Sequence, residues 1–337
     1  MFRSKILGFA AALAALLLPA VAAAQTPVRV GYIPILGVAP IFIADKEGWL
    51  AAAGLKPTFT PFESGPNMIQ ALASGTVDVY VAGVAPLGVA RSKGVDVKVV
   101  AATAIEEMTF VAGPRLAKYF EGGAKAAEAF AKFREAEGRP AKLATQPPGS
   151  VPDTTLKHWV YKVGGTKESD VQIVAMGIDA TQQALLAGAV DGATVREPAV
   201  SIITTRNPAT RLVALGGDMF PNQPGTVVAV SGAFLAKNPE GVQKMVKAVV
   251  DAIDLIAKDP DRTVPHIEAA LGKGIVETSI IRKAVASPAS KFVADPRVII
   301  EPSRLMQQYQ VTIGTLDKEV PLDGLFDTSF YQKATGR

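Results

Sequence analysis

The chain has 337 residues, of which 49% are hydrophobic and 20% charged, and its net charge is +4 with both histidines neutral. Residues 1–24 hold two of the 35 basic residues and none of the 31 acidic ones, so the rest of the chain has a net charge of +2. Basic and acidic residues are interspersed, which argues against a nucleic-acid partner. The sequence contains no cysteine, which excludes disulfides, thiolate metal sites and a lipid-modified cysteine.

The first 24 residues have the layout of a cleavable secretory signal. Arg3 and Lys5 precede an apolar run over 6–21, and three alanines stand directly before Gln25. The apolar run is too short and too rich in alanine for a membrane span. We expect cleavage after Ala24 and a free periplasmic protein rather than a lipoprotein.

Strand and helix patterns alternate in the first part of the mature chain. They predict, in order, a strand over 28–34, a helix over 40–53 ended by Gly54, a strand over 55–62, a helix over 66–74 ended by Gly75, and a strand over 77–82. Strands that alternate with helices predict an α/β fold with a mostly parallel sheet.

A short segment recurs 113 residues later in the chain. The matching residues are Gln70, Ala71, Leu72, Gly75, Val77 and Asp78 in the first copy and Gln183, Ala184, Leu185, Gly188, Val190 and Asp191 in the second. Each copy follows a predicted strand, at 55–62 and at 171–176, and ends a helix at a glycine suited to the left-handed conformation. The repeat predicts two α/β lobes of related design. Chance reuse of a common helix-to-strand junction is the alternative.

The strand patterns at 97–104 and 109–114 predict where the chain leaves the first lobe and enters the second. The pattern at 226–231 predicts its return, and two crossings form a hinge. We therefore expect a signal peptide over 1–24, lobe one over 25–104 and 225–337, and lobe two over 105–224. A helix over 122–137 is expected on the surface of lobe two, with solvated charges. The helices near 239–258 and 302–316 are expected to buttress lobe one.

Residues typical of catalysis are scarce. His158 and His266 each stand alone in a helical pattern, which favours a surface or packed structural role. The sequence has no metal-ligand spacing, no nucleophile elbow and no phosphate-binding loop. Glu106 and Glu107 are adjacent, and adjacent residues of an extended strand point to opposite faces, so at most one of them should line a cleft. We expect no enzyme activity, no metal and no cofactor.

Ligands of open α/β sheets bind beyond the carboxyl ends of the strands, where loops lead into helices. This rule selects the candidate ligand-binding residues Pro34, Leu36, Ser64, Gly65, Gly83, Val84, Ala85, Glu107, Gln146, Ser150, Val151, Arg196, Glu197 and Thr226. Ser64 and Ser150 could instead serve only as helix caps.

Arg196 is the main charged candidate. The repeat gives residues 83–85 of lobe one the same structural place as residues 196–198 of lobe two. An arginine in a narrow cleft suits a carboxylate, a sulfonate or a phosphonate, which it binds through two parallel hydrogen bonds. In the alternative, Arg196 pairs with Glu197 or another acid at the rim of the cleft.

Four segments carry a family resemblance. They are VRVGYIP at 28–34, APIFIADKEGWLAAAGL at 39–55, QALASGTVDVYVAG at 70–83 and QALLAGAVDGATVREPA at 183–199. Together they resemble the periplasmic binding proteins of nitrate, sulfonate and taurine importers, which are related to thiamin-precursor binding proteins. The resemblance extends over about residues 28–258.

The resemblance implies a two-lobed periplasmic binding protein fold of type II, with two mixed, mostly parallel sheets flanked by helices and hinged by two crossing strands. It also implies a monomer that passes a small molecule to the permease and ATPase of an ABC importer. Glu197 and Pro198 match the family's acid and proline after the second repeat. The segment PPGSVPDTT at 147–155 departs from the family's Gly-Ser/Thr-rich loop, which leaves the identity of the ligand open.

Two other functions remain possible on this scaffold. Pyrimidine synthases that resemble thiamin-precursor binders are enzymes, but they carry a cysteine-rich segment and a reacting histidine. A periplasmic ligand sensor is the other alternative, and a gene beside a histidine kinase rather than a permease would favour it.

Overall fold

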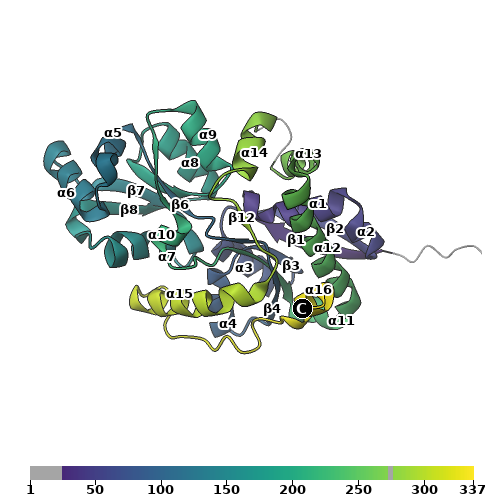
Figure 1. Cartoon of the computed structure of the whole chain (residues 1–337). Coiled ribbons are helices and arrows are strands. Elements are labelled where there is room, and N and C mark those ends of the chain that lie inside the picture. Colours follow the sequence, from purple (N-terminus) through teal and green to yellow (C-terminus); the bar gives the residue numbers. More distant parts are fainter. Residues whose placement is uncertain (1–24, 272–275) are drawn as a thin grey trace, which may run out of the picture.

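The computed structural model describes residues 25–271 and 276–337. The expected signal peptide, residues 1–24, lies outside the described residues. The described part folds around two five-stranded sheets with helices on their faces (Figure 1). Among the described helices, none is long and apolar enough to cross a membrane.

The sheet of lobe one has the strand order β2-β1-β3-β11-β4. Its strands are β1 (Thr26–Tyr32), β2 (Leu55–Pro61), β3 (Val79–Gly83), β4 (Val97–Ala102) and β11 (Thr226–Ser231). β1 pairs in parallel with β2 and β3, whereas β11 is antiparallel to both β3 and β4. Four of the five strands therefore run in the same direction, as a mixed, mostly parallel sheet requires.

The sheet of lobe two repeats this arrangement in the order β8-β7-β9-β6-β10. Its strands are β6 (Thr109–Ala112), β7 (Ala141–Thr145), β8 (Val171–Ala175), β9 (Gly192–Val195) and β10 (Arg211–Leu215). β7 pairs in parallel with β8 and β9, and β6 is antiparallel to β9 and β10. In each sheet, four strands run in one direction, and the strand that stands fourth in the order, β11 or β6, runs in the opposite direction. The expected fold class is confirmed.

The helices of lobe one follow the predicted alternation with one difference. They are η1 (Leu36–Val38), α1 (Ala39–Lys46), α2 (Trp49–Ala52), α3 (Gly65–Ala73) and α4 (Ala85–Ser92). The single helix expected over 40–53 is wrong, because Gly48 takes φ +77° and divides the segment into α1 and α2. Such a left-handed residue cannot continue a right-handed helix.

The helices of lobe two include a second difference. They are α5 (Pro114–Ala117), η2 (Lys118–Gly123), α6 (Ala126–Glu137), α7 (Val151–Lys157), η3 (His158–Val163), η4 (Glu168–Asp170), α8 (Ile178–Leu186), α9 (Ala199–Arg206) and α10 (Gly216–Met219). The helix expected over 122–137 begins only at Ala126, because the backbone at Glu121 and Gly122 is not helical. Phe130 and Phe133 bury its apolar side, and its charged residues are exposed.

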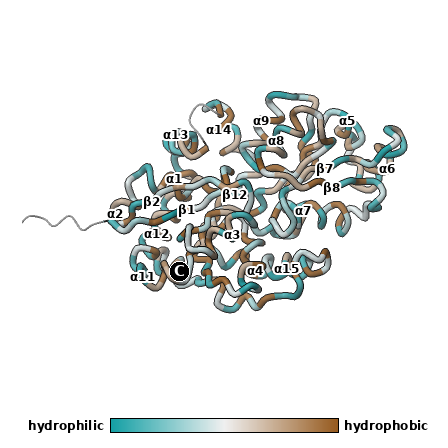
Figure 2. Tube along the Cα trace, turned by 180° about the vertical axis from the view of Figure 1, so that it is seen from behind, coloured by the Kyte–Doolittle hydropathy of each residue, from teal (hydrophilic) through white to brown (hydrophobic). Residues whose placement is uncertain are grey.

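The remaining elements lie after β11. They are α11 (Gly232–Lys237), α12 (Pro239–Lys258), α13 (Pro260–Ala270), α14 (Thr278–Val285), β12 (Lys291–Phe292), η5 (Pro296–Ile299), α15 (Ile300–Thr312) and α16 (Ser329–Thr335). α12 packs on α1 and α16, as expected for a buttress of lobe one. The expectation is incomplete for the others, since α14 also packs on α9 and α15 also packs on α7 of lobe two (Figures 1 and 2).

Each lobe has its own apolar core, which follows the hydrophobic strands in Figure 2. The chain crosses between the lobes just after β5 (Ala104–Ile105) and returns just before β11. The two crossings lie side by side: the Glu106 N–H donates to the Gln223 carbonyl oxygen at 2.9 Å, and the Met108 N–H donates to Gln223 Oε1 at 3.1 Å. A paired double crossing of this kind permits lobe closure about a hinge.

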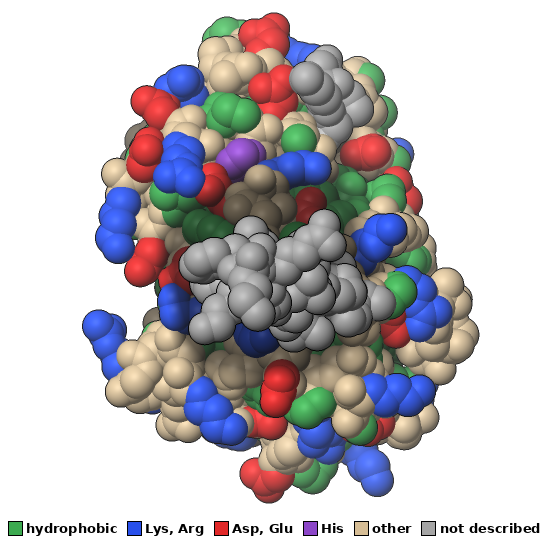
Figure 3. Space-filling view, turned by 90° about the vertical axis from the view of Figure 1, so that its right-hand side faces the viewer, with side chains coloured by type: hydrophobic (Ala, Val, Ile, Leu, Met, Phe, Trp, Pro, Cys, Tyr) green, Lys and Arg blue, Asp and Glu red, His purple; other side chains and the backbone are tan. Residues whose placement is uncertain are grey.

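Acidic and basic side chains are interspersed over the face of the molecule shown in Figure 3.

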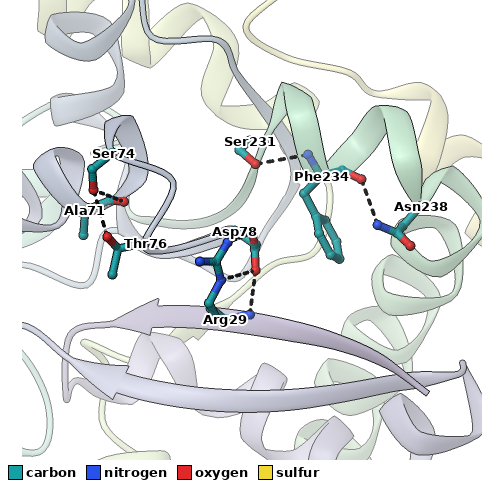
Figure 4. Close-up of polar contacts among 8 residues, drawn as sticks. All are labelled: Arg29, Ala71, Ser74, Thr76, Asp78, Ser231, Phe234 and Asn238. Carbon is teal, nitrogen blue, oxygen red and sulfur yellow. Dashed lines mark hydrogen bonds and ion pairs between the residues drawn. The ribbon is translucent and has the colours of Figure 1, made fainter. Parts of the chain in front are cut away.

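The first copy of the repeat includes a polar contact between two strands. In lobe one, Arg29 on β1 donates its backbone N–H and its guanidinium to Asp78, just before β3 (Figure 4). The carboxylate therefore fixes β1 beside β3.

Candidate ligand-binding cleft

The two lobes meet at the carboxyl ends of β3 and β9. β3 ends at Gly83, and a Cβ atom built there would lie 2.7 Å from Val151 Cγ2 of lobe two. The Leu36 N–H of lobe one donates to the Glu197 carbonyl oxygen of lobe two at 2.8 Å. The lobes are therefore in direct contact, and a side chain at Gly83 would press against Val151.

An apolar cluster fills part of this junction. Its members are Ala85, Met108, Val151, Phe220 and Met306, with Tyr309 at its edge. Ala85 belongs to α4 of lobe one and Val151 to α7 of lobe two, so the cluster joins the lobes. Met306 reaches it from α15, which sequence reasoning placed against lobe one alone.

Arg196 follows β9 and is buried between the lobes, with 3% of its side chain exposed. Its Nε donates to Met108 Sδ at 2.8 Å, and its Nη1 lies 3.8 Å from Glu107 Oε1. Burial lowers the pKa of Arg196, because it disfavours the charged form, whereas the nearby Glu107 opposes this change. Arg196 is thus a cation held inside the cleft rather than at its rim.

Glu107 is the acid beside Arg196, and only 5% of its side chain is exposed. Its Oε1 accepts a hydrogen bond from Thr226 Oγ1 at 2.6 Å. A Cβ atom at Gly37 would collide with Glu107 Oε2, so the backbone of η1 is closely packed against this oxygen. Glu107, which belongs to lobe two, therefore touches β11 and η1 of lobe one.

Glu106 and Glu107 have different neighbours, as expected, but a bend rather than an extended backbone separates them. Glu106 takes φ +48° in a bend between β5 and β6. This bend turns Glu106 to an ion pair with Lys291 and leaves Glu107 in the cleft. One carboxylate of the two thus faces the cleft.

Glu197 does not pair with Arg196. Its carboxylate accepts hydrogen bonds from the Ser201 N–H at 3.0 Å and from Ser201 Oγ at 3.1 Å. Burial raises the pKa of Glu197, and its hydrogen bonds with Ser287 and Ser201 oppose that change. Of the alternative expected for Arg196, the ion pair with a neighbouring acid is present, with Glu107 rather than Glu197 as the partner, but the pair is buried rather than at the rim.

Three buried polar atoms near the carboxyl ends of β7 and β9 have no hydrogen-bond partner within residues 25–271 and 276–337. They are Arg196 Nη1, Glu107 Oε2 and Gln146 Oε1. Gln146 directly follows β7, which lies beside β9 in the sheet. Buried polar groups normally have partners, because leaving one unpaired costs about 1–3 kcal/mol. This group of atoms is consistent with a ligand that supplies the missing partners.

The two candidate serines cap helices. Ser64 Oγ accepts the Asn67 N–H at 3.4 Å at the start of α3, and Ser150 Oγ accepts the Asp153 N–H at 3.3 Å at the start of α7. Pro152 occupies the first turn of α7, as predicted. The cap roles are therefore present, and ligand contact by either serine stays a prediction.

The other candidates surround this centre at different depths. Pro34 is half-buried before η1, Gly65 lies against Tyr80 Oη and Pro86, and Val84 packs into the core of lobe one. Val84 therefore faces its own lobe rather than Arg196. Sequence reasoning missed Gly37, Met108 and Gln223, because close packing at a hinge has no local sequence signal.

Neither histidine belongs to this centre. His158 Nδ1 lies 2.8 Å from the Met219 carbonyl oxygen, and His266 Nε2 lies 2.9 Å from Glu47 Oε1. In the described ranges, no group of three or more His, Cys, Asp or Glu side chains is arranged to hold a metal ion. A cavity of about 10 Å³ beside Glu107, Gly37 and Glu197 has room for about one water molecule.

Comparisons with known proteins agree with this architecture. The model of the NMT1-like family matches residues 21–266. A Brucella abortus protein named only as a binding protein is 29% identical over 259 residues, which cover 76% of this chain and 75% of the relative. The taurine-binding periplasmic protein of Escherichia coli is 28% identical over 228 residues, which cover 66% of this chain and 64% of the relative.

A solved structure shows the same fold. The ligand-binding component of an ABC-type import system from Staphylococcus aureus superimposes with a TM-score of 0.75 and 17% identity. The match covers 93% of this chain and all of that chain. The likeness includes both lobes.

Proposed function

Because the chain belongs to the NMT1-like family, we propose that it is the solute-binding component of an ABC-type importer. It captures a small organic molecule between its lobes and delivers it to a membrane permease that an ATPase subunit drives. The observation that carries this proposal is the buried Arg196, whose Nη1 has no hydrogen-bond partner in the described part of the chain. A relative named as part of an ABC-type import system supports the transport role.

The ligand site comprises the residues that the cleft brings together. Arg196 and Glu107 form its polar centre, and Gly83, Thr226 and Gln146 surround them. Arg196 by itself favours an acid, such as a sulfonate or a carboxylate, and taurine in the name of a relative supports a screen that includes sulfonates. Ligand contact with both lobes stabilises the closed arrangement, since a ligand shifts a conformational equilibrium only through contacts that differ between the two states.

The place and state of the protein are part of the same proposal. We propose export to the periplasm after removal of residues 1–24, and action there as a free monomer. Lobe one comprises 25–104 and 225–337, and lobe two comprises 105–224. A relative named as a periplasmic protein supports this location.

We propose a binding role without catalysis. Relatives named as binding proteins support it over the alternative of an enzyme on the same scaffold. Of the acid and base candidates, Glu106 pairs with Lys291 and both histidines have structural partners, so Glu107 is the one that remains in the cleft.

A ligand screen tests the proposal. Residues 25–337 are screened by thermal shift against organic acids, sulfonates, amides and heterocycles, because a ligand of the folded form raises the melting temperature by mass action. Calorimetry with each hit should give saturable one-to-one binding, and chromatography should recover the ligand unchanged. Conversion of the ligand to a product would contradict the binding role.

Two arginine variants localise the binding. Arg196→Ala should weaken the affinity by about 2 kcal/mol, as expected for loss of a charged hydrogen-bond donor. Arg211→Ala removes an exposed arginine of β10 in the same lobe and serves as the matched control. Equal affinity in Arg196→Ala and the control would place the ligand elsewhere.

A further inference from the structure

The centre of the cleft holds two opposite charges rather than one. Arg196 and Glu107 are both buried, and the 3.8 Å between Arg196 Nη1 and Glu107 Oε1 is too long for a direct hydrogen bond. The pair therefore balances in charge, while each partner retains hydrogen-bonding capacity. An uncompensated charge in such a buried site carries a large desolvation cost.

The neighbours of the pair determine which atoms remain available. Met108 Sδ accepts from Arg196 Nε, and Thr226 Oγ1 donates to Glu107 Oε1. Arg196 Nη1 and Glu107 Oε2 are left without partners among the residues that the structure describes. The buried pair thus leaves one donor and one acceptor unpaired on adjacent side chains. The cavity beside Glu107, of about 10 Å³, has room for only one water molecule, so a head group reaches these atoms only when the lobes move apart.

This arrangement does not suit a simple anion. A carboxylate or sulfonate would accept from Arg196, but it has no proton to donate to Glu107 and would add a second negative charge beside it. Two neighbouring negative charges repel each other strongly when water is excluded. The expectation of an acidic ligand rests on Arg196 alone. In the structure, the negative charge of Glu107 offsets the positive charge of Arg196.

We propose that the ligand binds through an uncharged head group that carries an acceptor beside a donor, as a primary carboxamide does. Its carbonyl oxygen accepts from Arg196 Nη1, and its N–H donates to Glu107 Oε2. This inference rests on the proposed function and narrows its ligand class. Sites built to hydrogen-bond an N–H group discriminate strongly against analogues that lack it, because the buried protein group is then left unpaired.

Matched probes test the head group. Three series share a body and differ only in the head: acetamide, acetate and methanesulfonate; benzamide, benzoate and benzenesulfonate; 2-naphthamide, 2-naphthoate and 2-naphthalenesulfonate. In calorimetry, at least one carboxamide should bind about 100-fold more tightly than both of its anions. A tighter anion in every binding series, or no binding by any carboxamide, would overturn the inference.

Glu107→Gln distinguishes an amide from an anionic head group by the direction in which the affinity changes. If Glu107 accepts the amide proton, loss of its charge should weaken carboxamide binding by about 10-fold. If the natural head group is an anion, the same variant should strengthen binding, because it removes a repulsion. Glu106→Gln is the matched control, since Glu106 is the adjacent acid and faces Lys291 instead.

The failure of this inference differs from the failure of the proposed function. Anions that bind one-to-one, depend on Arg196 and bind more tightly to Glu107→Gln would overturn the uncharged head group and leave the solute-binding role intact. Conversion of a bound probe to a product, or an affinity that Arg196→Ala leaves unchanged, would count against the solute-binding role itself.

Discussion

The two lobes share an arrangement of strands and helices whose matching residues lie 113 positions apart. They differ in the residues that follow β3 and β9. In lobe one, the Arg29 N–H donates to Asp78 Oδ2 at 2.9 Å, and in lobe two the Lys142 N–H donates to Asp191 Oδ2 at 2.8 Å. Arg29 and Lys142 are themselves 113 residues apart. The repeat thus extends beyond the matched sequence to the strand that each carboxylate fixes, and it preserves a structural contact rather than a binding one.

The residues beyond the last shared strand differ completely. Gly83 after β3 has no side chain and lies directly against Val151 of lobe two, whereas its counterpart Arg196 after β9 carries a long, charged and buried side chain. The Gly83 position lies 3.6 Å from Arg196 Nη2, measured from an ideal Cβ. The lack of a side chain at Gly83 therefore permits the close approach of the two lobes at this point.

The shared carboxylates also differ in burial. The side chain of Asp78 is 13% exposed and that of Asp191 is 1% exposed. Asp191 accepts from Arg139 through both guanidinium Nη atoms and lies 3.5 Å from Arg115 Nε. Burial alone would raise the pKa of Asp191, but hydrogen bonds from Arg139 and Lys142 outweigh it and lower the pKa. The same contact should contribute more to stability in lobe two.

The largest expected effect is the difference between Asp191→Ala and Asp78→Ala. Loss of Asp191 leaves the Lys142 N–H and Arg139 without their acceptor and Arg115 without its ion-pair partner, and should lower the free energy of unfolding by about 3 kcal/mol. Loss of the more exposed Asp78 should cost about 1 kcal/mol. Urea unfolding measures both, and equal losses would contradict the comparison.

The two tryptophans allow each lobe to be followed separately. Trp49 belongs to α2 of lobe one and Trp159 to η3 of lobe two. In variants that retain one tryptophan, Asp191→Ala should shift the Trp159 transition more than the Trp49 transition. The opposite order is expected for Asp78→Ala.

Gly83→Ala tests the close contact between Gly83 of lobe one and Val151 of lobe two. The new Cβ would lie 2.7 Å from Val151 Cγ2, so the lobes cannot approach as closely, and overpacking of this kind costs about 2 kcal/mol. The affinity for a ligand found by the screen should fall by about 30-fold at that cost. Val151→Ala in the same chain should recover much of the affinity, and no recovery would remove the contact from the closing interface.

The sequence allows much of the frame to be predicted and little of the site. Strand 226–231 and helix 239–258 match β11 and α12 in their bounds, because β-branched runs and a 3.6-residue period are local signals. The serine caps of α3 and α7 are equally local. By contrast, Arg196 and Glu107 are far apart in the chain, and their pairing depends on a bend at Glu106 that the alternation of residues does not reveal.

The contacts of α15 were not predictable for the same reason. An amphipathic pattern identifies the apolar face of a helix but not the lobe that this face meets. α15 lies against α4 and also against α7, so lobe one extends a helix onto lobe two. This asymmetry is the third difference between the lobes, since lobe two has no counterpart after its own sheet within the described residues.

Gln310→Ala tests this asymmetry with a smaller effect. Gln310 is fully buried on α15, and its Nε2 donates to the Gly149 carbonyl oxygen just before α7 at 3.2 Å. Loss of the bond should weaken ligand binding by about 1 kcal/mol, because the contact joins the lobes and stabilises their closed arrangement. Gln308→Ala on the same helix is the control, and the same loss in both variants would show a general effect on α15.

The smallest expected effect concerns pH at the same contact. His158 of lobe two packs against Phe220 at 4.4 Å between ring centroids and against Tyr309 of α15 at 4.9 Å. Burial lowers the pKa of His158 below its usual 6.5, although its hydrogen bond with the Met219 carbonyl opposes the change. Between the two pKa values the unfolded chain binds more protons, so the free energy of unfolding rises with pH, and this contribution is lost as the pH falls below about 6.5. An NMR titration should give a His158 midpoint below 6.5, and His158→Phe should flatten the pH dependence of stability between about pH 7.5 and 5.5. A midpoint at or above 6.5 would show that α15 and lobe two leave the ring open to water, and the contact would then contribute nothing to the pH response.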